Sequence, residues 1–271
     1  MATTTTPTTK GFVGKRVRRT EDPRLITGTA TYVDDITRPG MLYAAVLRSP
    51  HASARVVGIS IEKAAALPGV SAVYTGKDIQ EVGPVPCAGS MPTLRVPHHK
   101  ILAQDRVYYV GHPVVAVVAS DRYVAQDAVD QIEVEYEPTD CIVDPEKSLD
   151  DNAVRVHPEY DDNVAFTFHA EGGDTDKAFE VADVIVSERV TVPRLAPSPM
   201  ETRGVVAEYD EGTKELLVYS STQIPHLLKT QLAVQLSLPE NHVRVIAPEV
   251  GGGFGIFRET TLISTAATHQ L

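Results

Sequence analysis

Long apolar runs mark the expected buried strands in the first half of the chain. Met41–Leu47 and Val114–Ala119 are almost continuously apolar, which is typical of strands that are buried on both faces. Between them, Glu62–Leu67 has the pattern of a short helix, and Pro68-Gly69 ends it. A further strand is predicted over Val70–Tyr74. Strands and helices therefore alternate in this half of the chain.

Before residue 140, the spacing of apolar residues changes from that of a helix to that of a strand. Asp121 is a suitable N-cap for a helix that runs to about Gln131. Apolar residues recur along this helix at the spacing of a single face, at Val124, Ala128, Val129 and Ile132. From Ile132 to Tyr136, apolar residues alternate with glutamates. This alternation predicts a strand with one solvent-exposed face, which Pro138 ends.

The second half of the chain begins after a segment that is rich in Asp, Pro and other polar residues, Asp140–Glu159. The pattern predicts a short helix over Thr175–Val181 and a long strand over Asp183–Val192. A hairpin is predicted next, with strands over Gly204–Tyr209 and Glu215–Ser220 joined by a polar turn.

A helix and a strand complete the expected second region. Pro225 can occupy the first turn of a helix, and Leu228, Leu232 and Leu236 then form an apolar stripe. Val243 and Val245 lie in a strand that leads to three consecutive glycines. The pattern thus predicts a mixed α/β or α+β chain with two regions, and by itself it indicates no function.

Charge and composition exclude several classes of function. The chain has 271 residues and a formal net charge of −11. Such a surface offers no large Lys/Arg cluster to neutralise phosphates, so we expect no nucleic-acid binding. No stretch approaches the ~18 apolar residues that a membrane-spanning helix needs, so we expect no such helix. The Thr-rich segment Met1–Lys10 predicts a disordered tail and not a secretory signal.

The two cysteines do not suggest a metal centre. Cys87 and Cys141 are far apart and cannot build an iron–sulfur or zinc site alone. We interpret both as packing residues. An unlinked pair also fits a reducing cytoplasm, which is the expected location of the protein.

The glycine run is the most unusual local feature of the sequence. Gly251-Gly252-Gly253-Phe254-Gly255 follows a predicted strand. Consecutive glycines permit positive φ and close approach of another group, and successive N–H groups in such a turn can bind an anion. A tight structural turn is the alternative. The spacing does not fit a dinucleotide-binding loop, because the third glycine position falls on Ile256.

Gln223 is the second candidate, because it lies between a predicted strand and a predicted helix in Ser221-Thr222-Gln223-Ile224-Pro225. Its amide could contact a ligand at the strand end, or Gln223 and Thr222 could merely cap the helix. The nine histidines form no metal-binding motif, and no Gly-x-Ser-x-Gly sequence supports a serine hydrolase.

Several short segments occur in an order and at a spacing that together are specific. They are Arg24-Leu25-Ile26-Thr27-Gly28, Tyr32-Val33-Asp34-Asp35-Ile36, Arg48-Ser49-Pro50-His51-Ala52, Val110-Gly111-His112-Pro113-Val114, Glu135-Tyr136-Glu137-Pro138, Gly173-Asp174, Pro199-Met200-Glu201-Thr202-Arg203-Gly204, Ser221-Thr222-Gln223 and the glycine run. In this order they resemble the large, molybdopterin-binding subunit of the molybdenum hydroxylases. This is the xanthine dehydrogenase/aldehyde oxidase/aerobic carbon monoxide dehydrogenase family.

The resemblance implies an α+β fold with two domains. An α/β-hammerhead domain over residues 20–138 would be followed by the beginning of a molybdopterin-binding domain with a mixed sheet over residues 161–258. Residues 139–160 would connect them. Residues 1–19 would form the tail and the segment leading into the first domain, and residues 259–271 would form a tail outside the family pattern.

The resemblance also implies a cofactor, a site and partners. In this family a molybdenum ion held by a pterin dithiolene hydroxylates a substrate carbon or oxidises carbon monoxide with water-derived oxygen. Gln223 would hydrogen-bond an oxygen ligand of the molybdenum, and Gly252, Gly253, Phe254 and Gly255 would present backbone N–H groups to the cofactor. The cofactor would be molybdenum-pterin in its cytosine dinucleotide form. An iron–sulfur small subunit and an FAD-binding medium subunit would be the partners.

The chain departs from the family pattern in places. His112 stands where the family often has Glu, and Ile256-Phe257-Arg258 stand where a lysine often follows the glycines. The family's other pterin contacts, substrate loop and glutamate base have no counterpart in this sequence, so we expect either a truncated or frame-shifted product or one piece of a split subunit. We therefore expect the isolated chain to hold no cofactor and show no turnover. We also expect exposed apolar surface and an unpaired strand at Val243–Ala247 and around Ile256-Phe257.

Two functional hypotheses follow. In the first, the chain contributes part of a molybdenum pocket that other chains complete, as in a split subunit. In the second, it is a truncated, catalytically inactive fragment that acts at most as a folding or interaction module. Carbon monoxide, a purine, an aldehyde and an N-heterocycle all stay open as substrates, and general similarity favours the carbon monoxide dehydrogenase branch.

Overall fold

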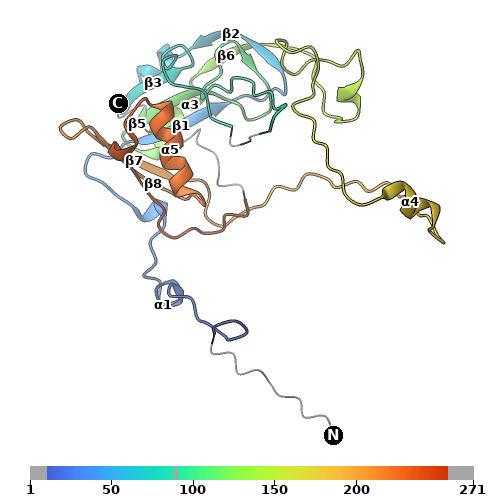
Figure 1. Ribbon diagram of the computed structural model, residues 1–271. Coiled ribbons are helices and arrows are strands. Elements are labelled where there is room, and N and C mark those ends of the chain that lie inside the picture. Colours follow the sequence, from blue (N-terminus) through green and yellow to red (C-terminus); the bar gives the residue numbers. More distant parts are fainter. Residues whose placement is uncertain (1–10, 88, 90, 256–271) are drawn as a thin grey trace.

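The computed structural model describes residues 11–87, 89 and 91–255. Figure 1 shows a body made of two packed regions, from which two arms project. One arm is N-terminal and carries α1 (Asp22–Ile26), and the other carries α4 (Thr175–Glu180). The expected α+β fold with mixed helix and strand content is confirmed.

The first region contains an antiparallel sheet with β5 in its centre. The strand order is β1 (Tyr43–Arg48), β5 (Pro113–Ala119) and β3 (Val70–Thr75). Every residue of β5 is buried, as predicted. The prediction that the first strand is also buried on both faces is wrong, because β1 is an edge strand and its side chains are partly or fully exposed.

A second small sheet covers the first. Its strand order is β4 (Arg106–Val107), β2 (Ala54–Ser60) and β6 (Glu133–Pro138). The hydrophobic pattern does not predict β2, because a bulge between Val56 and Gly58 interrupts its alternation. In β6, Val134 and Tyr136 face the core and the glutamates face solvent, as predicted.

Two helices close this core. They are α2 (Glu62–Ala65) and α3 (Arg122–Asp130). Asp121 caps α3 as predicted, because its Oδ1 accepts hydrogen bonds from the N–H groups of Tyr123 (2.8 Å) and Val124 (2.9 Å). Ala125, Ala128 and Val129 then form the buried face of the helix.

The second region is built on a mixed sheet. Its order is β7 (Val205–Asp210), β8 (Glu215–Ser220) and β9 (Val243–Ile246). β7 and β8 form the predicted antiparallel hairpin, whereas β8 and β9 are parallel. The connection between the parallel strands contains α5 (Pro225–Gln235). Leu228 and Leu232 of this helix are buried against the sheet.

The edge of this sheet only partly matches the expectation for Val243–Ala247. β9 pairs with β8 alone among the described strands, so it is an edge strand as expected. Val243 is nevertheless buried in the cluster that α5 covers, so this strand does not expose the expected apolar surface. Ile256-Phe257 and the stretch 259–271 lie outside the described residues.

The predicted long strand over Asp183–Val192 is absent, and that prediction is wrong. The segment is neither helix nor strand and pairs with no described strand. It runs from α4 back to the body as the exposed arm of Figure 1. Strand identity requires a neighbour that satisfies the backbone hydrogen bonds, and the described chain supplies none here.

Three short 3-10 helices complete the described elements: η1 (Val33–Asp35), η2 (Lys147–Leu149) and η3 (Glu240–His242). The cysteines are not packing residues as expected, because Cys87 and Cys141 are both exposed in segments outside the sheets. Among the described residues, every helix is too short or too polar to span a bilayer.

His112 is an unusual component of the first region. It directly precedes β5 and is only 2% exposed. Its Nδ1 accepts a hydrogen bond from the N–H of Tyr108 (3.2 Å), and its ring stacks on Tyr109 at 4.7 Å between centroids. Its Nε2 has no hydrogen-bond partner among the described residues. Burial, and then the charge of neighbouring His99, lower the pKa of His112 from 6.5 to about 4.

This shift predicts a specific loss of stability in acid. The folded state binds the His112 proton more weakly than the unfolded state, so stability is complete above pH 6.5 and falls as the pH drops toward 4. The contribution over this window is about 3 kcal/mol. We expect His112→Asn, which keeps an acceptor near Nδ1, to remove this part of the pH dependence. Urea denaturation at several pH values measures the difference.

The matched control is His226→Asn, because His226 is an exposed histidine on α5. It should leave the pH dependence of unfolding unchanged. A constant difference in free energy between the wild type and His112→Asn across the whole pH range would refute the assignment.

Candidate cofactor site

The two candidate segments of the sequence meet at one end of the mixed sheet. β8 and β9 are parallel and in register, with Tyr219 opposite Ile246. Gln223 therefore follows one strand end and the glycine turn follows the neighbouring one. The structure thus brings together the two segments that the family resemblance assigns to one cofactor. Ligands commonly bind beyond the carboxyl ends of parallel strands, where loops from adjacent strands lie close together.

Gln223 is in direct contact with the turn. Its Oε1 accepts a hydrogen bond from the N–H of Gly255 (2.9 Å). A Cβ on Gly253 would lie 2.2 Å from Cδ of Gln223, so only glycine allows this approach without a displacement.

Gln223 does not cap α5. The N-cap residue of that helix is Ile224, and the helix start receives no side-chain cap. The N–H of Ile224 donates instead to Oγ1 of Thr222 (3.2 Å). The structure therefore decides against the capping role for Gln223.

The turn itself combines unusual backbone conformations. Gly252 (φ 113°), Phe254 (φ 44°) and Gly255 (φ 82°) all lie in the region of positive φ. The Phe254 side chain points away from the core and is 71% exposed. A non-glycine residue in this conformation indicates that the surroundings hold the turn.

Three successive N–H groups of the turn are available to a ligand. The N–H groups of Gly251 and Gly255 are bonded to Glu201 and Gln223. Between them, the N–H groups of Gly252, Gly253 and Phe254 donate to no residue in the described part of the chain. A row of free N–H groups in a turn with positive φ forms a concave site for an anion or a metal-bound oxygen.

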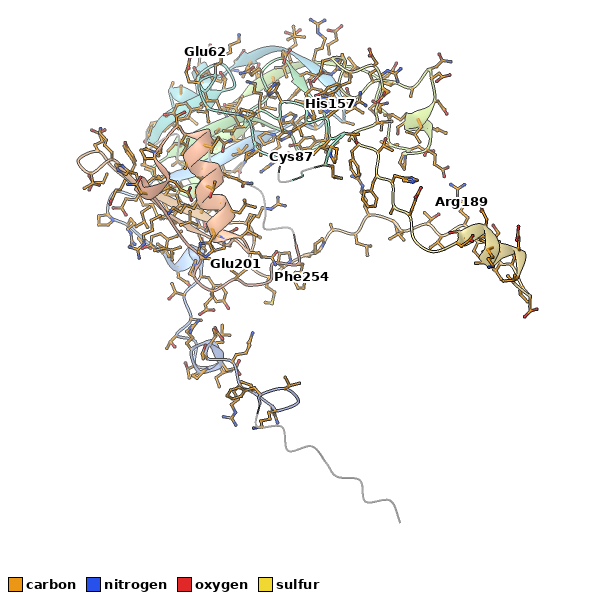
Figure 2. All side chains as sticks on the ribbon, in the orientation of Figure 1. Glu62, Cys87, His157, Arg189, Glu201 and Phe254 are labelled. Carbon is orange, nitrogen blue, oxygen red and sulfur yellow. The ribbon has the colours of Figure 1, made fainter. Side chains whose placement is uncertain are left out.

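Glu201 is a functional residue that the sequence analysis did not identify. Its Oε2 accepts from the N–H of Gly251 (2.6 Å), and its Oε1 accepts from the N–H of Val33 (3.3 Å). Its own N–H donates to the carbonyl of Gly251 (3.3 Å). Figure 2 shows Glu201 and Phe254 at the same end of the second region. The only sequence signal was the position of Glu201 within Met200-Glu201-Thr202-Arg203-Gly204.

The N-terminal segment supports the same turn. Arg24 forms an ion pair with Glu249, and the N–H of Glu249 donates to the carbonyl of Thr31 (3.1 Å). Residues 24–33 thus brace the strand-to-turn connection from outside. This segment lies far from the glycines in sequence but next to them in space.

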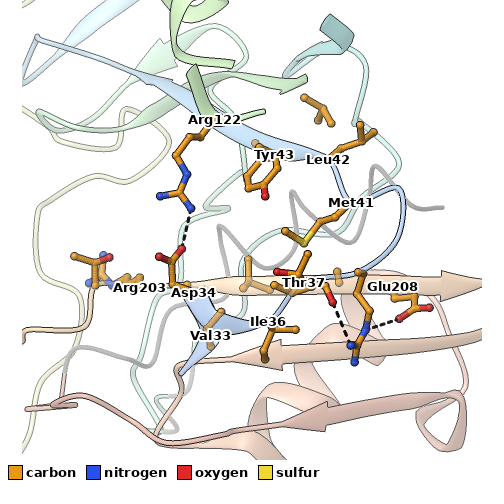
Figure 3. Close-up of a pocket in the computed structure, with 18 of the residues that line it drawn as sticks. Val33, Asp34, Ile36, Thr37, Met41, Leu42, Tyr43, Arg122, Arg203 and Glu208 are labelled. Atoms are coloured by element: carbon orange, nitrogen blue, oxygen red, sulfur yellow. Dashed lines mark hydrogen bonds and ion pairs between the residues drawn. The ribbon is translucent and has the colours of Figure 1, made fainter. Parts of the chain in front are cut away.

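A pocket of about 700 Å³ lies between the two regions and borders this site. Figure 3 shows its walls, which come from the segment around Asp34, from β1 around Tyr43 and from β7 around Glu208. Arg122 crosses it to pair with Asp34 (3.0 Å). Glu201 lines the pocket as well, so the pocket and the glycine turn share one wall.

Protein side chains do not form a metal centre in the described ranges. No group of three or more His, Cys, Asp or Glu side chains there could hold a metal ion. The site therefore consists of backbone N–H groups and one amide. These donors fit a polar cofactor that brings its own metal, and they do not fit a bare metal ion.

Comparisons with known families agree with this arrangement. Residues 27–140 match the a/b hammerhead domain of aldehyde oxidase and xanthine dehydrogenase. Residues 156–269 match the molybdopterin cofactor-binding domain. The second match extends into residues 259–271, so the similarity runs further than the sequence motifs indicated.

Individual relatives give the same result. The chain is 40% identical to the nicotine 6-hydroxylase large subunit of Paenarthrobacter nicotinovorans over 97% of its length. It is 38% identical to the carbon monoxide dehydrogenase large chain of Afipia carboxidovorans over 90% of its length. The crystal structure of quinoline 2-oxidoreductase from Pseudomonas putida 86 superposes with a TM-score of 0.82 at 36% identity, over 89% of this chain.

The chain belongs to the xanthine dehydrogenase/aldehyde oxidase family of molybdopterin-binding large subunits. It spans about a third of these relatives, namely 33% of the nicotine hydroxylase subunit, 31% of the carbon monoxide dehydrogenase chain and 31% of the quinoline enzyme chain. The similar region covers 55% of the nicotinate dehydrogenase large molybdopterin subunit of Eubacterium barkeri, whose chain is therefore much shorter. Large subunits of this family thus differ in length.

The close contact between Gly253 and Gln223 predicts a non-additive pair of variants. In Gly253→Ala the new Cβ displaces the Gln223 side chain and breaks its bond to Gly255, which should cost about 1 kcal/mol of stability. In a Gln223→Ala background the same substitution should cost almost nothing, because the displaced group is gone. Urea unfolding of the two single variants and the double variant measures the coupling.

Gly172→Ala is the matched control, since a Cβ there meets nothing within 4 Å. Equal costs of Gly253→Ala in both backgrounds would show that the contact does not constrain the turn.

Proposed function

We propose that the chain supplies part of the molybdenum–pterin site of a molybdenum hydroxylase large subunit. The carrying observation is a row of three N–H groups, those of Gly252, Gly253 and Phe254, that have no acceptor among the described residues and lie beside the Gln223 amide. The family membership supports the same assignment. The cofactor is proposed to be the cytosine dinucleotide form of molybdenum-pterin.

Each residue of the site has a separate task in this proposal. Oε1 of Gln223 is occupied by Gly255, so the Nε2 amide group is left to donate to an oxygen of the cofactor. The N–H groups of Gly252, Gly253 and Phe254 donate alongside it. The bound cofactor supplies the redox chemistry that transfers water-derived oxygen to a substrate. The chain contributes fixed donors, whose orientation is set before the ligand arrives.

Glu201 is the acidic residue at this site, but its geometry does not suit a general base. Both of its carboxylate oxygens accept backbone hydrogen bonds, from Val33 and from Gly251. Removing a substrate proton would require breaking one of these bonds. We therefore assign Glu201 to positioning, and the proton-accepting group of the complete enzyme to the part of the large subunit beyond the described residues.

The partners and location are proposed from the family. An iron–sulfur small subunit and an FAD-binding medium subunit would carry electrons away, and the assembly would be cytoplasmic. The similar proteins act, by their names, on nicotine, carbon monoxide and quinoline, so the substrate class stays open between carbon monoxide and heterocycles. A folding or interaction module without turnover is the second candidate.

Cofactor loading tests the proposal. The isolated chain should contain no stoichiometric molybdenum and show no turnover, because one amide and one turn supply only part of the contacts a charged pterin needs. The complete large subunit with its small and medium subunits should contain molybdenum. In that assembly, Gln223→Ala should lower kcat by about a hundredfold, because it removes one fixed hydrogen-bond donor to the charge that develops in the transition state.

Gln126→Ala on the exposed side of α3 is the matched control and should leave turnover unchanged. Metal analysis and substrate-dependent dye reduction are the measurements. Stoichiometric molybdenum on the isolated chain would contradict the proposal. Full activity of Gln223→Ala in the complete assembly would contradict it as well.

A further inference from the structure

The short 3-10 helix η1 precedes the first sheet in sequence, yet it contacts the candidate site of the second region. Val33, its first residue, is only 4% exposed. The N–H of Val33 donates to Oε1 of Glu201 (3.3 Å), and the other oxygen of that carboxylate accepts from Gly251. A Cβ on Gly204 would lie 3.0 Å from Cγ1 of Val33, so this side chain packs closely against the backbone that leads into β7.

The residues just before η1 hold the segment from which the glycine turn departs. The carbonyl of Thr31 accepts from the N–H of Glu249 (3.1 Å), and Glu249 also forms an ion pair with Arg24. Two positions further on, Gly251 bonds to Glu201 through both its N–H and its carbonyl. One continuous segment near the start of the chain is thus linked to the entrance of the turn at two points.

Contacts of its own hold η1 in shape. The N–H of Tyr32 donates to Oδ2 of Asp35 (2.8 Å), which caps the short helix. Asp34 pairs with Arg122 of α3 (Figure 3), but both side chains are exposed, and such pairs stabilise little. The local cap therefore sets where the Val33 N–H points.

The link between η1 and the turn depends on a carboxylate. Each oxygen of Glu201 accepts one backbone hydrogen bond, and an ionised carboxylate presents acceptors only. An amide in its place would turn its NH2 group toward one of the two donors. Because both bonds share one planar group, the position of Val33 restricts the position of Gly251.

We propose that η1 positions the cofactor turn: acting through Glu201, the Val33 N–H sets the alignment of the N–H groups of Gly252, Gly253 and Phe254. Val33 is a positioning residue in this inference. Its loss should alter the backbone of the turn without removing any donor from it. That the turn receives a cofactor rests on the proposed function, whereas the coupling between η1 and the turn does not.

Val33→Pro removes the N–H that makes this link. Proline is tolerated at the first position of a helix, and Tyr32 before it is extended (φ −103°, ψ 172°), as a following proline requires. The proline ring also keeps apolar bulk at this buried position. Val33→Ala is the matched control, because it keeps the N–H and removes side-chain packing instead.

Amide resonances of ¹⁵N-labelled glycines in the full chain measure the effect. In Val33→Pro, the resonances of Gly251 and Gly253 should shift, and the Gly251 N–H should exchange at least about tenfold faster. In Val33→Ala, the exchange rate should change less than about twofold. Unshifted resonances of Gly58 and Gly111 in the first region show that the fold is retained.

A cycle with Glu201 separates this coupling from general destabilisation. In a Glu201→Gln background, Val33→Pro should shift the Gly251 resonance no further, because the shared carboxylate is already lost. Val33→Ala should lower the melting temperature equally in both backgrounds, because its cost is one of packing.

Two results of these measurements overturn the inference. The first is a Val33→Pro chain whose Gly251 and Gly253 amides are unchanged, and the second is an equal effect of Val33→Ala. If Val33→Pro unfolds the chain, Asp35→Ala replaces it, because this variant removes the cap of η1. Asp34→Ala is then the control, and equal glycine spectra of these two variants overturn the inference as well.

Molybdenum content tests the link to the cofactor separately. In the complete large subunit with its small and medium subunits, Val33→Pro should lower the molybdenum retained after dialysis about fivefold. Val33→Ala should change it less than about twofold. Shifted glycine amides together with full molybdenum content would contradict only the proposed function, and the positioning of the turn by η1 would stand.

Discussion

The carboxylate of Glu201 is the constraint on which the candidate site depends. It joins three segments that are remote in sequence, because it accepts hydrogen bonds from Val33 and Gly251 while its own N–H donates to Gly251. A Cβ on Gly251 would lie 2.4 Å from Cβ of Glu201, so the close approach also requires glycine at that position. Gly251 is fixed from one side and Gly255 from the other, and the N–H groups of the residues between them donate to no residue in the described part of the chain.

Local sequence signals predicted the elements that carry the site but only part of the site itself. The hairpin, the helix from Pro225 and the parallel strand before the glycines follow from period and turn chemistry, and a strand–helix–strand order brings Gln223 to the turn. Glu201 could not be predicted, because its role arises from contacts to residues 50 and 168 positions away. Strand β2 could not be predicted either, because its bulge interrupts the alternation of apolar and polar residues.

The arm over residues 184–192 shows why a correct pattern can yield a wrong element. Alternating valines do predict a strand, but the segment is neither helix nor strand. Pairing, however, depends on a neighbour, and period two carries no information on whether the neighbour is present. By contrast β5, with the same β-branched composition, lies between β1 and β3 and is buried throughout. The difference between these two segments is therefore one of partners and not of propensity.

The candidate site and the arm differ in the contacts that the described residues give them. The mixed sheet has a buried core under α5, and the hydrogen bond from the N–H of Gly255 to Gln223 ties the glycine turn to the end of β8. The arm has no such support, and its valines face solvent. The described residues therefore fix one wall of the candidate site, with Gln223 exposed on it. Fixed donors act most strongly where water is excluded, so under the proposed function this wall is covered when the cofactor is bound.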